Sequence, residues 1–257
     1  MATRTCIGIA ADVLQQWPEA RVGILLAQVP NQQSKSGPVA KYLSNLKQEV
    51  VRGVSRDGIT GNNFQDLRVC QSWNHVFSTF GTKGMESTIV RLIGRAAMQG
   101  DKLREGKIKN ADMGKISDPV DLYNCVSIET RTPMGALCLN GIRGNLVLRY
   151  GQQGETFTTL GRVEETYPVQ PGDIVYADDH SVVTWLWNYM DAKHACIPRP
   201  DKSDKLVDVI FFADQAEENA GDAKLAIETL AQRIEHIGGR VIQLGQLDRE
   251  NPVLELV

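Results

Sequence analysis

The sequence predicts an α+β fold in which compact, layered mixed β-sheets are surrounded by helices. Apolar runs of strand length and stretches with apolar residues at helical spacing occur in the same chain, and they are mixed rather than strictly alternating. At 257 residues the chain is long enough to bury a core without disulfides. We therefore expect a single domain, residues 1–257, with no internal repeat.

The N-terminal part is predicted to begin with one strand and to continue with three helices. Residues 21–29 (RVGILLAQV) form a short apolar run bounded by charge and by Pro30, which is typical of a buried strand. Apolar residues recur at helical spacing in three later segments, which predicts amphipathic helices over residues 39–54, 67–80 and 85–98.

The C-terminal part is predicted to be rich in strands. Five segments have strand length and end in Gly, Pro or Asp-Asp turns, and they should form one folded sheet system: residues 123–128, 145–150, 155–160, 173–176 and 182–188. Residues 206–213 (LVDVIFFA) form the clearest buried strand of the chain. A helix over residues 222–237, stopped by Gly238 and Gly239, and a last strand over residues 240–244 follow it.

Composition and motifs exclude several classes of protein. A net charge of -3 and a pI near 5.9 argue against a general nucleic-acid coat, because such binding rests on summed Lys and Arg. The five cysteines are widely spaced and the four histidines are scattered, so we expect no disulfide framework, no metal and no cofactor. No serine hydrolase, thiol protease or P-loop motif is present. No apolar run approaches the ~18 residues of a membrane span, so we expect no membrane partner and a cytoplasmic location.

A local basic patch is compatible with the acidic total. Basic residues cluster in DKLREGKIKNADMGK, residues 101–115, and Arg91 and Arg95, four positions apart, share one side of the helix predicted over residues 85–98. These cations either pair with carboxylates and face solvent, or contact phosphate. The candidate nucleic-acid-binding residues are Arg91, Arg95, Lys107 and Lys109.

Five sequence words follow one another in the order found in a known family. They are ESTIVRLIGRA at 86–96, DPVDLYNCVS at 118–127, GNLVLRYGQQGETFTTLG at 144–161, PGDIVYADD at 171–179 and WNY at 187–189. Together they resemble the editing module of the phenylalanyl-tRNA synthetase β subunit, the B3/B4 domain, in its free-standing form. The resemblance covers about residues 77–212 and implies a three-layer core of two sheets and helices, with the N-terminal strand and helix and the C-terminal strand-helix-strand packed on it.

The resemblance also implies an activity. Full-length relatives hydrolyse the ester between a wrong amino acid and tRNA, mainly by holding the amino acid and a water in place. Such a site needs a pocket, an acceptor for the ammonium group, and amide or hydroxyl groups that fix the carbonyl and the water. The residues of this chain can supply each of these groups.

Three residues are candidates for the catalytic set. Asn124 lies where the family has a pocket-lining Thr-Asn pair, with Tyr123 in place of the Thr, and the alternative is an Asn that ties down a turn. Glu155 lies near the implied mouth of the pocket, or is a charge at a strand edge. Asp191 lies close to the position of the synthetase's selectivity Glu and could bind an ammonium group.

The candidate substrate-binding residues include departures from the family pattern. Gly135 stands where the synthetase carries a His, so the imidazole that could position water is absent. In TWLWNYMD, aromatic and apolar residues replace the cysteine and arginines usual in free-standing members. On a strand, Trp185, Trp187 and Tyr189 would point the same way, either into the core or along an apolar pocket. The complete set is Tyr123, Gly135, Thr158, Trp185, Trp187, Asn188 and Tyr189.

Three functions follow from these residues. The first is recognition of an aminoacyl group with hydrolysis of mischarged aminoacyl-tRNA or a related activated amino-acid ester. The second is a non-catalytic gatekeeper that holds an amino-acid-derived small molecule made by a partner ATP-dependent ligase. The third is an RNA-binding module without catalysis, which would depend on the basic residues 102–115. The sequence leaves the amino acid, the partner and the oligomeric state open.

Overall fold

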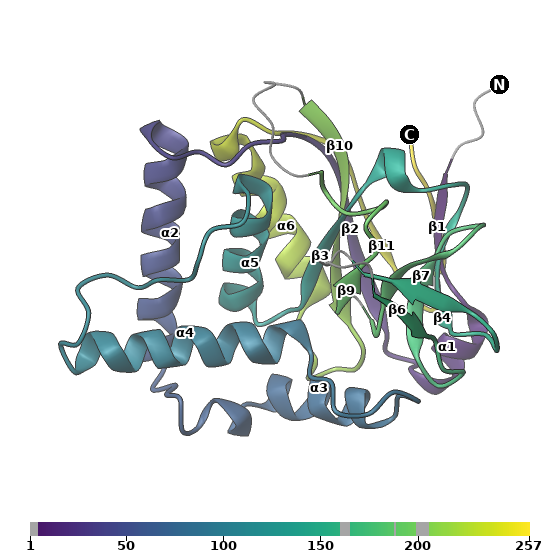
Figure 1. Cartoon of the computed structure of the whole chain (residues 1–257), viewed down its shortest axis with the longest axis horizontal. Helices are drawn as coiled ribbons and strands as arrows, with labels where there is room; N and C mark the ends of the chain where they lie inside the picture. Colours follow the sequence, from purple (N-terminus) through teal and green to yellow (C-terminus); the bar gives the residue numbers. More distant parts are fainter. Residues whose placement is uncertain (1–4, 160–164, 188, 199–205) are drawn as a thin grey trace.

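The computed structural model describes residues 5–159, 165–187, 189–198 and 206–257, and in them it shows three layers (Figure 1). Helices form one outer layer. A four-stranded sheet with the order β11-β2-β10-β3 lies in the middle, and a six-stranded sheet with the order β12-β1-β4-β7-β8-β9 lies beyond it. A separate two-stranded sheet joins β5 and β6. This mixture of sheets and helices confirms the predicted α+β class.

The strands of the two larger sheets are mostly antiparallel. The middle sheet consists of β2 (Arg21–Pro30), β3 (Met134–Cys138), β10 (Leu206–Gln215) and β11 (Arg240–Leu247). The outer sheet consists of β1 (Cys6–Ile9), β4 (Leu146–Tyr150), β7 (Ile174–Ala177), β8 (Val182–Trp185), β9 (Met190–Asp191) and β12 (Val253–Glu255). The small sheet pairs β5 (Thr156–Thr158) with β6 (Thr166–Pro168). Among these strands β1 and β4 are parallel, and every other pair is antiparallel.

The helical layer consists of the long helices, which are α2 (Gly37–Arg56), α3 (Arg68–Ser78), α4 (Thr88–Arg104), α5 (Asp118–Thr130) and α6 (Ala223–Arg233). The short helix α1 (Ala11–Gln16) lies beside β4 instead. Three short 3₁₀ turns, η1 (Phe64–Asp66), η2 (Leu139–Gly141) and η3 (Ile234–Ile237), complete the described elements. Helix α6 packs on β2 and β10, and α5 packs between α2, α6 and β3. None of the helices in the described residues has the length and apolarity that a membrane span requires.

Most of the predicted elements are confirmed. The strands expected over residues 21–29, 206–213 and 240–244 are β2, β10 and β11, and the helices expected over 39–54, 67–80, 85–98 and 222–237 are α2, α3, α4 and α6 with η3. Helix α6 begins at an Asp222 cap, whose carboxylate accepts the amide of Leu225 at 2.9 Å. It continues as η3, which ends at Gly238 with φ 81°, as a glycine stop requires.

The strand predicted over residues 123–128 is wrong, because this segment is part of helix α5. The β-branched and apolar run CVSI suggested a strand, yet α5 is covered by α2, α6 and β3, so its apolar residues show no one-sided pattern. The start of the helix had a sequence signal, since Pro119 lies in the first turn and Asp118 and Asp121 complement the helix N-terminus.

The strand predicted over residues 182–188 is only partly correct. Strand β8 ends at Trp185, and the next two residues, Leu186 and Trp187, have φ of 55° and 48°. Non-glycine residues rarely adopt this left-handed region, so the chain makes a sharp turn here. The three aromatic rings of this segment therefore do not alternate along one strand. The segments at 145–150 and 173–176 are β4 and β7; of the segment at 155–160, β5 covers 156–158, and residue 160 lies outside the described residues.

Two buried carboxylates fix the indole rings that follow β7. Asp173 accepts hydrogen bonds from the Thr82 amide and from Trp185 Nε1, both at 2.8 Å. Asp214 accepts the Tyr176 hydroxyl at 2.5 Å and Trp187 Nε1 at 3.3 Å. Buried polar atoms need such partners, so these contacts define a specific arrangement of the core next to β9.

Candidate functional site

Asp191, at the junction of the outer sheet with the helices, has a carboxylate whose pKa is far above its ordinary value. It ends the two-residue strand β9, where its Cα pairs with Thr184 of β8, and its side chain is half-buried. Within the described residues its carboxylate has no hydrogen bond or ion pair. Burial without a compensating cation raises the pKa of Asp191 to about 7. Such a carboxylate is suited to bind a cationic group.

Tyr123 of α5 lies within electrostatic range of Asp191. Its ring meets Phe211 of β10 edge-on, with the ring centroids 6.2 Å apart. Burial raises the pKa of Tyr123, and the negative charges of Asp191 and then Asp121 raise it further. The hydroxyl therefore stays protonated and can donate a hydrogen bond to a ligand beside Asp191.

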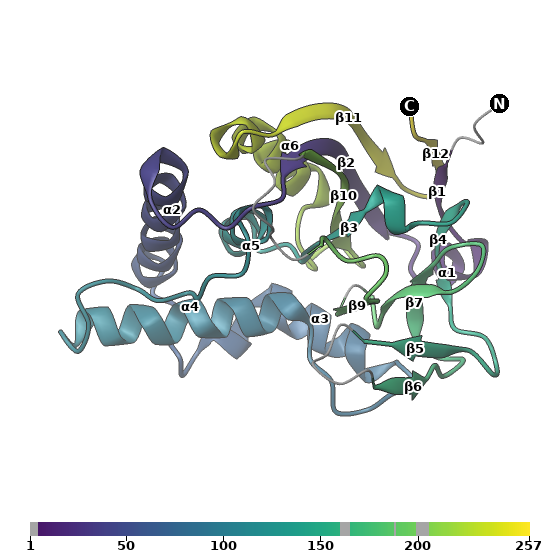
Figure 2. The same cartoon turned by 45° about the horizontal axis from the view of Figure 1, so that its top comes forward.

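Tyr189 and Arg91 form a stacked pair two residues before Asp191. The Arg91 guanidinium carbon lies 4.5 Å from the centroid of the half-buried Tyr189 ring, and the Phe77 ring lies 6.3 Å away on α3. A guanidinium over a tyrosine face is a cation–π contact. This pair brings the N-terminal end of α4 next to β9, as both views of the chain show (Figure 2).

The other predicted ligand-binding residues lie on elements around this junction. Asn124 follows Tyr123 on α5 and is half-buried, with no hydrogen bond to its side chain among the described residues. Gly135 is buried on β3, opposite Phe212 of β10. Thr158 of β5 places its hydroxyl 3.2 Å from that of Thr166, and the next residue, Thr159, bridges to Ala192 beside Asp191. The structure therefore places Tyr123 within electrostatic range of Asp191, and it places the end of β5 alongside the end of β9.

Glu155 is engaged elsewhere. Its two carboxylate oxygens accept Arg149 Nη1 at 2.9 Å and Nη2 at 2.6 Å, and one of them also accepts the Gln152 amide at 2.7 Å. Burial opposes ionisation, but these donors outweigh it, so the pKa of Glu155 is lowered. A carboxylate that is bound in this way stabilises the β4–β5 turn and is a poor general base.

We predict that Glu155→Gln leaves any activity of the protein unchanged. The expected effect is a loss of about 1–2 kcal/mol in the free energy of unfolding, because a partly exposed bidentate ion pair is weakened. Urea unfolding followed by circular dichroism measures this loss. A variant with native stability and an altered pH profile of activity would contradict it.

The indoles of Trp185 and Trp187 do not line a pocket, which corrects their prediction as substrate-binding residues. Each side chain is 2% exposed, and both rings are enclosed by other aromatic side chains of the core. Of the three aromatic residues in this segment, Tyr189 alone is half-buried rather than buried. Asn188 lies outside the described residues.

The predicted basic residues are divided between engaged and unpaired cations. Lys107 pairs with Glu105 at 2.7 Å, whereas Lys109 is exposed with no ion pair among the described residues. Arg95 is exposed, and one of its nitrogens lies 3.4 Å from the Asp112 carbonyl oxygen.

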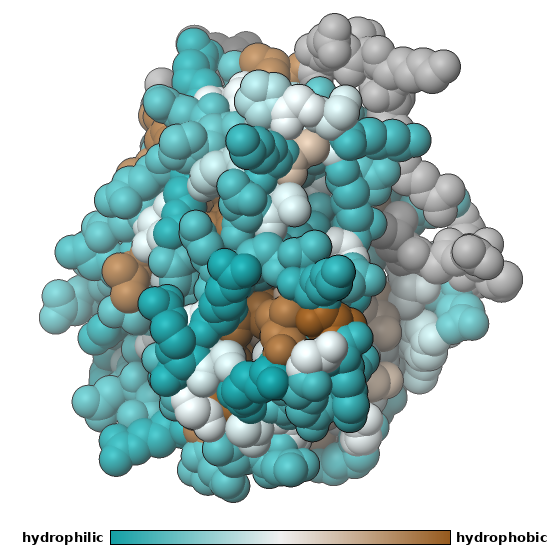
Figure 3. Space-filling model, turned by 90° about the vertical axis from the view of Figure 1, so that its left-hand side faces the viewer, coloured by the Kyte–Doolittle hydropathy of each residue, from teal (hydrophilic) through white to brown (hydrophobic). Residues whose placement is uncertain are grey.

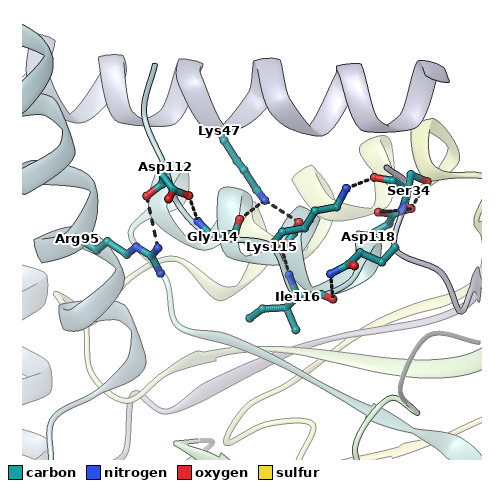
Figure 4. Close-up of polar contacts among 10 residues, drawn as sticks. Ser34, Lys47, Arg95, Asp112, Gly114, Lys115, Ile116 and Asp118 are labelled. Atoms are coloured by element: carbon teal, nitrogen blue, oxygen red, sulfur yellow. Dashed lines mark hydrogen bonds and ion pairs between the residues drawn. The ribbon is translucent and has the colours of Figure 1, made fainter. Parts of the chain in front are cut away.

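Segment 111–118, which follows these cations along the chain, is held against α2 (Figure 4). Lys47 of α2 reaches both the Gly114 carbonyl oxygen and the Asp121 carboxylate at 2.6 Å. Ser34 donates its hydroxyl to Asp118 at 2.5 Å and receives Lys115 on its carbonyl oxygen. This segment is therefore a fixed part of the surface rather than a solvated loop.

Phe211 is a neighbour of Tyr123 that the sequence did not indicate. Its run, LVDVIFFA, has the composition of a core strand, and no sequence pattern separates one core Phe from another. Its contact with Tyr123 depends on α5 being a helix that packs over the middle sheet, which the prediction of a strand at 123–128 excluded.

Together, these features define an α+β protein in which a half-buried carboxylate with a raised pKa and a protonated tyrosine hydroxyl lie on neighbouring elements. Residues 95–216 match the sequence profile of the family described as the B3/4 domain, which is a little under half of the chain. The chain thus resembles the B3/B4 family of the phenylalanyl-tRNA synthetase β subunit, as its sequence words indicated.

Two curated relatives support this resemblance. The phenylalanine–tRNA ligase β subunit of Fusobacterium nucleatum is 30% identical over 79 residues, which are 31% of this chain and 10% of that protein. The β subunit of Cutibacterium acnes is 32% identical over 77 residues, which are 30% of this chain and 9% of that protein. The match thus spans about a tenth of the length of these relatives.

One solved structure aligns with most of the chain. It is an N-terminal fragment of the phenylalanyl-tRNA synthetase β subunit from Pyrococcus horikoshii. The alignment covers 94% of this chain and 52% of the chain of the fragment, with a TM-score of 0.39 and 8% identity.

Proposed function

We propose that the protein binds an α-amino acyl group beside Asp191 and hydrolyses its ester, as in a mischarged aminoacyl-tRNA or a related activated amino-acid ester. The observation that supports this most strongly is the half-buried carboxylate of Asp191, which has a raised pKa and no cation among the described residues. An incoming ammonium group supplies the missing charge. The Tyr123 hydroxyl donates a hydrogen bond to the ligand from the neighbouring helix.

The proposed reaction needs no covalent intermediate with the protein. Water adds to the ester carbonyl, and the tetrahedral intermediate then releases the alcohol oxygen of the carrier, which takes up the proton lost by the water. The products are the free amino acid and the free hydroxyl group. In this proposal Asp191 holds the ammonium group, Tyr123 orients the acyl group, and the Asn124 amide holds the attacking water, so the catalysis comes from positioning.

A panel of aminoacyl-tRNAs, aromatic ones included, tests the proposal. We expect the wild type to release amino acid selectively. Asn124→Ala should lower kcat by roughly tenfold to a hundredfold with little change in KM, and Asp191→Asn should mainly raise KM, because the ammonium contact is made in the ground state as well. Release by a folded wild type that both variants retain in full would rule out this site.

One observation favours the gatekeeper as a second function. The family position that carries a His is Gly135 in this chain, and three of the four histidines have neighbours of their own. The ring of His75 meets Trp17 at 6.2 Å, that of His236 stacks on Tyr42 at 4.6 Å, and Nε2 of His194 lies 3.4 Å from Ser181 Oγ. His180 is exposed on the β7–β8 turn. A site with a carboxylate but no imidazole could hold an amino-acid-derived molecule for a partner ligase without hydrolysing it.

The same panel separates the two functions. A gatekeeper should bind amino-acid amides through Asp191 and release nothing from charged tRNA, and it should change the product of a ligase only when both proteins are present. Binding of amides together with release of amino acid from charged tRNA by the protein alone would exclude the gatekeeper.

A further inference from the structure

A cavity of about 360 Å³ lies between helices α2, α5 and α6, and none of the residues assigned to the acyl group lines it. Its floor is apolar and buried, and consists of Leu46, Val50 and Val54 of α2 with Ile128 of α5. The face of the molecule that carries α2 is mostly hydrophilic, and apolar side chains are visible at the bottom of a hollow in it (Figure 3). A cavity of this size and lining fits a small organic molecule.

Two charged side chains on the rim of this cavity, Glu49 and Arg56, form no ion pair in the described part of the chain. Both are exposed residues of α2, and they are seven positions apart, so they lie on one face of the helix. At 1.5 Å per residue their backbones are about 10 Å apart along the helix axis. Val50 and Val54 of the floor lie between them, so the cavity has a negative end, an apolar middle and a positive end.

The negative end of the cavity lies beside Tyr42. Burial raises the pKa of the Tyr42 hydroxyl, the charge of Arg233 opposes this rise, and the negative charges of Glu129 and Glu49 add to it. Arg233 itself donates to both carboxylate oxygens of Glu129, at 2.5 and 2.9 Å. This bidentate pair occupies the guanidinium group, so the Glu49 carboxylate is left to receive a cation from outside the chain.

The positive end is formed by Arg56, the last residue of α2. Its Nη2 atom lies 4.0 Å from the position that a Cβ atom on Gly53 would take, and the described residues leave this position otherwise open. The next residue, Asp57, binds Arg131, which ends α5 with φ 54°, a conformation that non-glycine residues rarely adopt. Because the Asp57 carboxylate is engaged in this way, the Arg56 guanidinium is left to receive an anion.

We infer that this cavity binds a short apolar peptide with free termini, of about three residues, with its ammonium group at Glu49 and its carboxylate at Arg56. The two charges of a single α-amino acid belong to one residue and are too close together to reach both ends. An extended chain rises about 3.3–3.6 Å per residue, so three residues span the roughly 10 Å between the two positions. A ligand with only one charge would leave Glu49 or Arg56 without a partner.

Calorimetric titration with Ala-Leu-Ala at pH 7 tests the inference. We expect a Kd on the order of 0.1 mM. Acetylation of the N-terminus and amidation of the C-terminus should each weaken binding by about threefold to tenfold, because each removes one partly exposed ion pair. Free leucine in excess should not displace the peptide. A wild type that fails to bind Ala-Leu-Ala at about 1 mM, or a peptide that leucine displaces, would overturn the inference.

Two variants assign the ends of the peptide. Glu49→Gln should bind Ala-Leu-Ala as weakly as the wild type binds the acetylated peptide, and acetylation should then have no further effect. Arg56→Gln should show the same insensitivity to amidation. Arg52→Gln removes an exposed charge of the same helix that does not line the cavity, and it should bind all the peptides as the wild type does. Variants at 49 and 56 that remain fully sensitive to both modifications would contradict the assignment.

Filling the cavity is an independent test. Gly53→Leu places a side chain in the open space beside the floor, and since leucine favours a helix over glycine, the variant should fold with a Tm no lower than that of the wild type. It should lose binding of Ala-Leu-Ala by tenfold or more. Gly53→Ala is the matched control, because it gains helix propensity too but fills little of the cavity, and it should keep most of the affinity. Full binding by a folded Gly53→Leu would rule out this cavity.

Asp191→Asn separates the inference from the proposed function. This variant should bind Ala-Leu-Ala with the affinity of the wild type, because Asp191 does not line the cavity. Loss of peptide binding in Asp191→Asn together with full binding by Gly53→Leu would place the peptide at the acyl-group site and overturn the inference. Hydrolysis of aminoacyl esters that Gly53→Leu retains in full would show that the two sites act independently, as expected.

Discussion

Asp191→Asn is expected to make the protein more stable above pH 7 while weakening its binding of an amino-acid amide by about tenfold or more. The carboxylate has a pKa of about 7 in the folded chain, against about 3.9 in an unfolded one. Between these values the folded state holds a proton that the unfolded state has released, so the stability of the wild type falls as the pH rises from about 4 to about 7. The asparagine variant lacks this loss.

The size of the effect follows from the shift and from the exposure of the group. A pKa of about 7 instead of about 3.9 corresponds to about 4 kcal/mol for a fully desolvated carboxylate, and to about 1–2 kcal/mol for Asp191, because it is only half-buried and solvent screens its charge. For a chain of this length, this is about 2–8 °C in Tm at pH 8. At pH 4 the Asp and Asn side chains are both neutral, and the two proteins should have nearly the same Tm.

Binding should show the opposite dependence on pH. The ammonium group of an amide pairs with the ionised carboxylate, so the affinity of the wild type should rise as the pH approaches 7 and fall again above about pH 8, where the α-amino group of the ligand loses its proton. Calorimetric titration with amino-acid amides at about pH 5.5 and pH 7 measures the rise. Asp208→Asn, which neutralises another half-buried aspartate on β10, is the matched control and should alter neither property. A loss of stability at pH 8 in Asp191→Asn would contradict the assignment of Asp191.

The elements that the sequence predicted correctly are those whose pattern depends on one covered face or on full burial. Helices α2, α3 and α4 each bury one side, so apolar residues at helical spacing were sufficient to find them. Helix α5 lies between other helices and β3, so burial on several sides removed the pattern, and the local propensity of its β-branched residues then favoured a strand. The helix-start signal at Asp118 and Pro119 was present but was outweighed.

The candidate site was predictable in part for the same reason. Tyr123 and Asp191 were named from the resemblance, but their proximity depends on α5 being a helix and on β9 being the edge strand of the outer sheet. No sequence pattern reports that Glu155 binds Arg149, because Arg149 lies on β4 and Glu155 lies just before β5 of a different sheet, and the sequence does not state how the turn between them folds. The indoles at 185 and 187 were open to two interpretations, and the left-handed turn between them decided the outcome.

Trp187→Ala is expected to destabilise the fold by about 3–5 kcal/mol, which is about 6–20 °C in Tm for a chain of this length. The Trp187 ring is 2% exposed and meets Trp17 and Trp73 edge-on, with centroids 5.9 and 5.6 Å apart. Truncation leaves a cavity among these rings and removes a donor from the buried carboxylate of Asp214. Urea unfolding followed by circular dichroism is the suitable measurement, since the tryptophan fluorescence itself changes in the variant.

Tyr189→Ala is the matched comparison, because it removes another aromatic ring from the same short segment. This ring is half-buried and holds Arg91 at the edge of the candidate site, so its loss should cost about 1 kcal/mol of stability and should weaken ligand binding. If Trp187 lined a pocket, Trp187→Ala would instead change ligand preference and leave stability near that of the wild type. The two variants thus test the segment on either side of residue 188: the Trp187 ring is buried in the core, and we expect the half-buried Tyr189 ring to matter for the ligand.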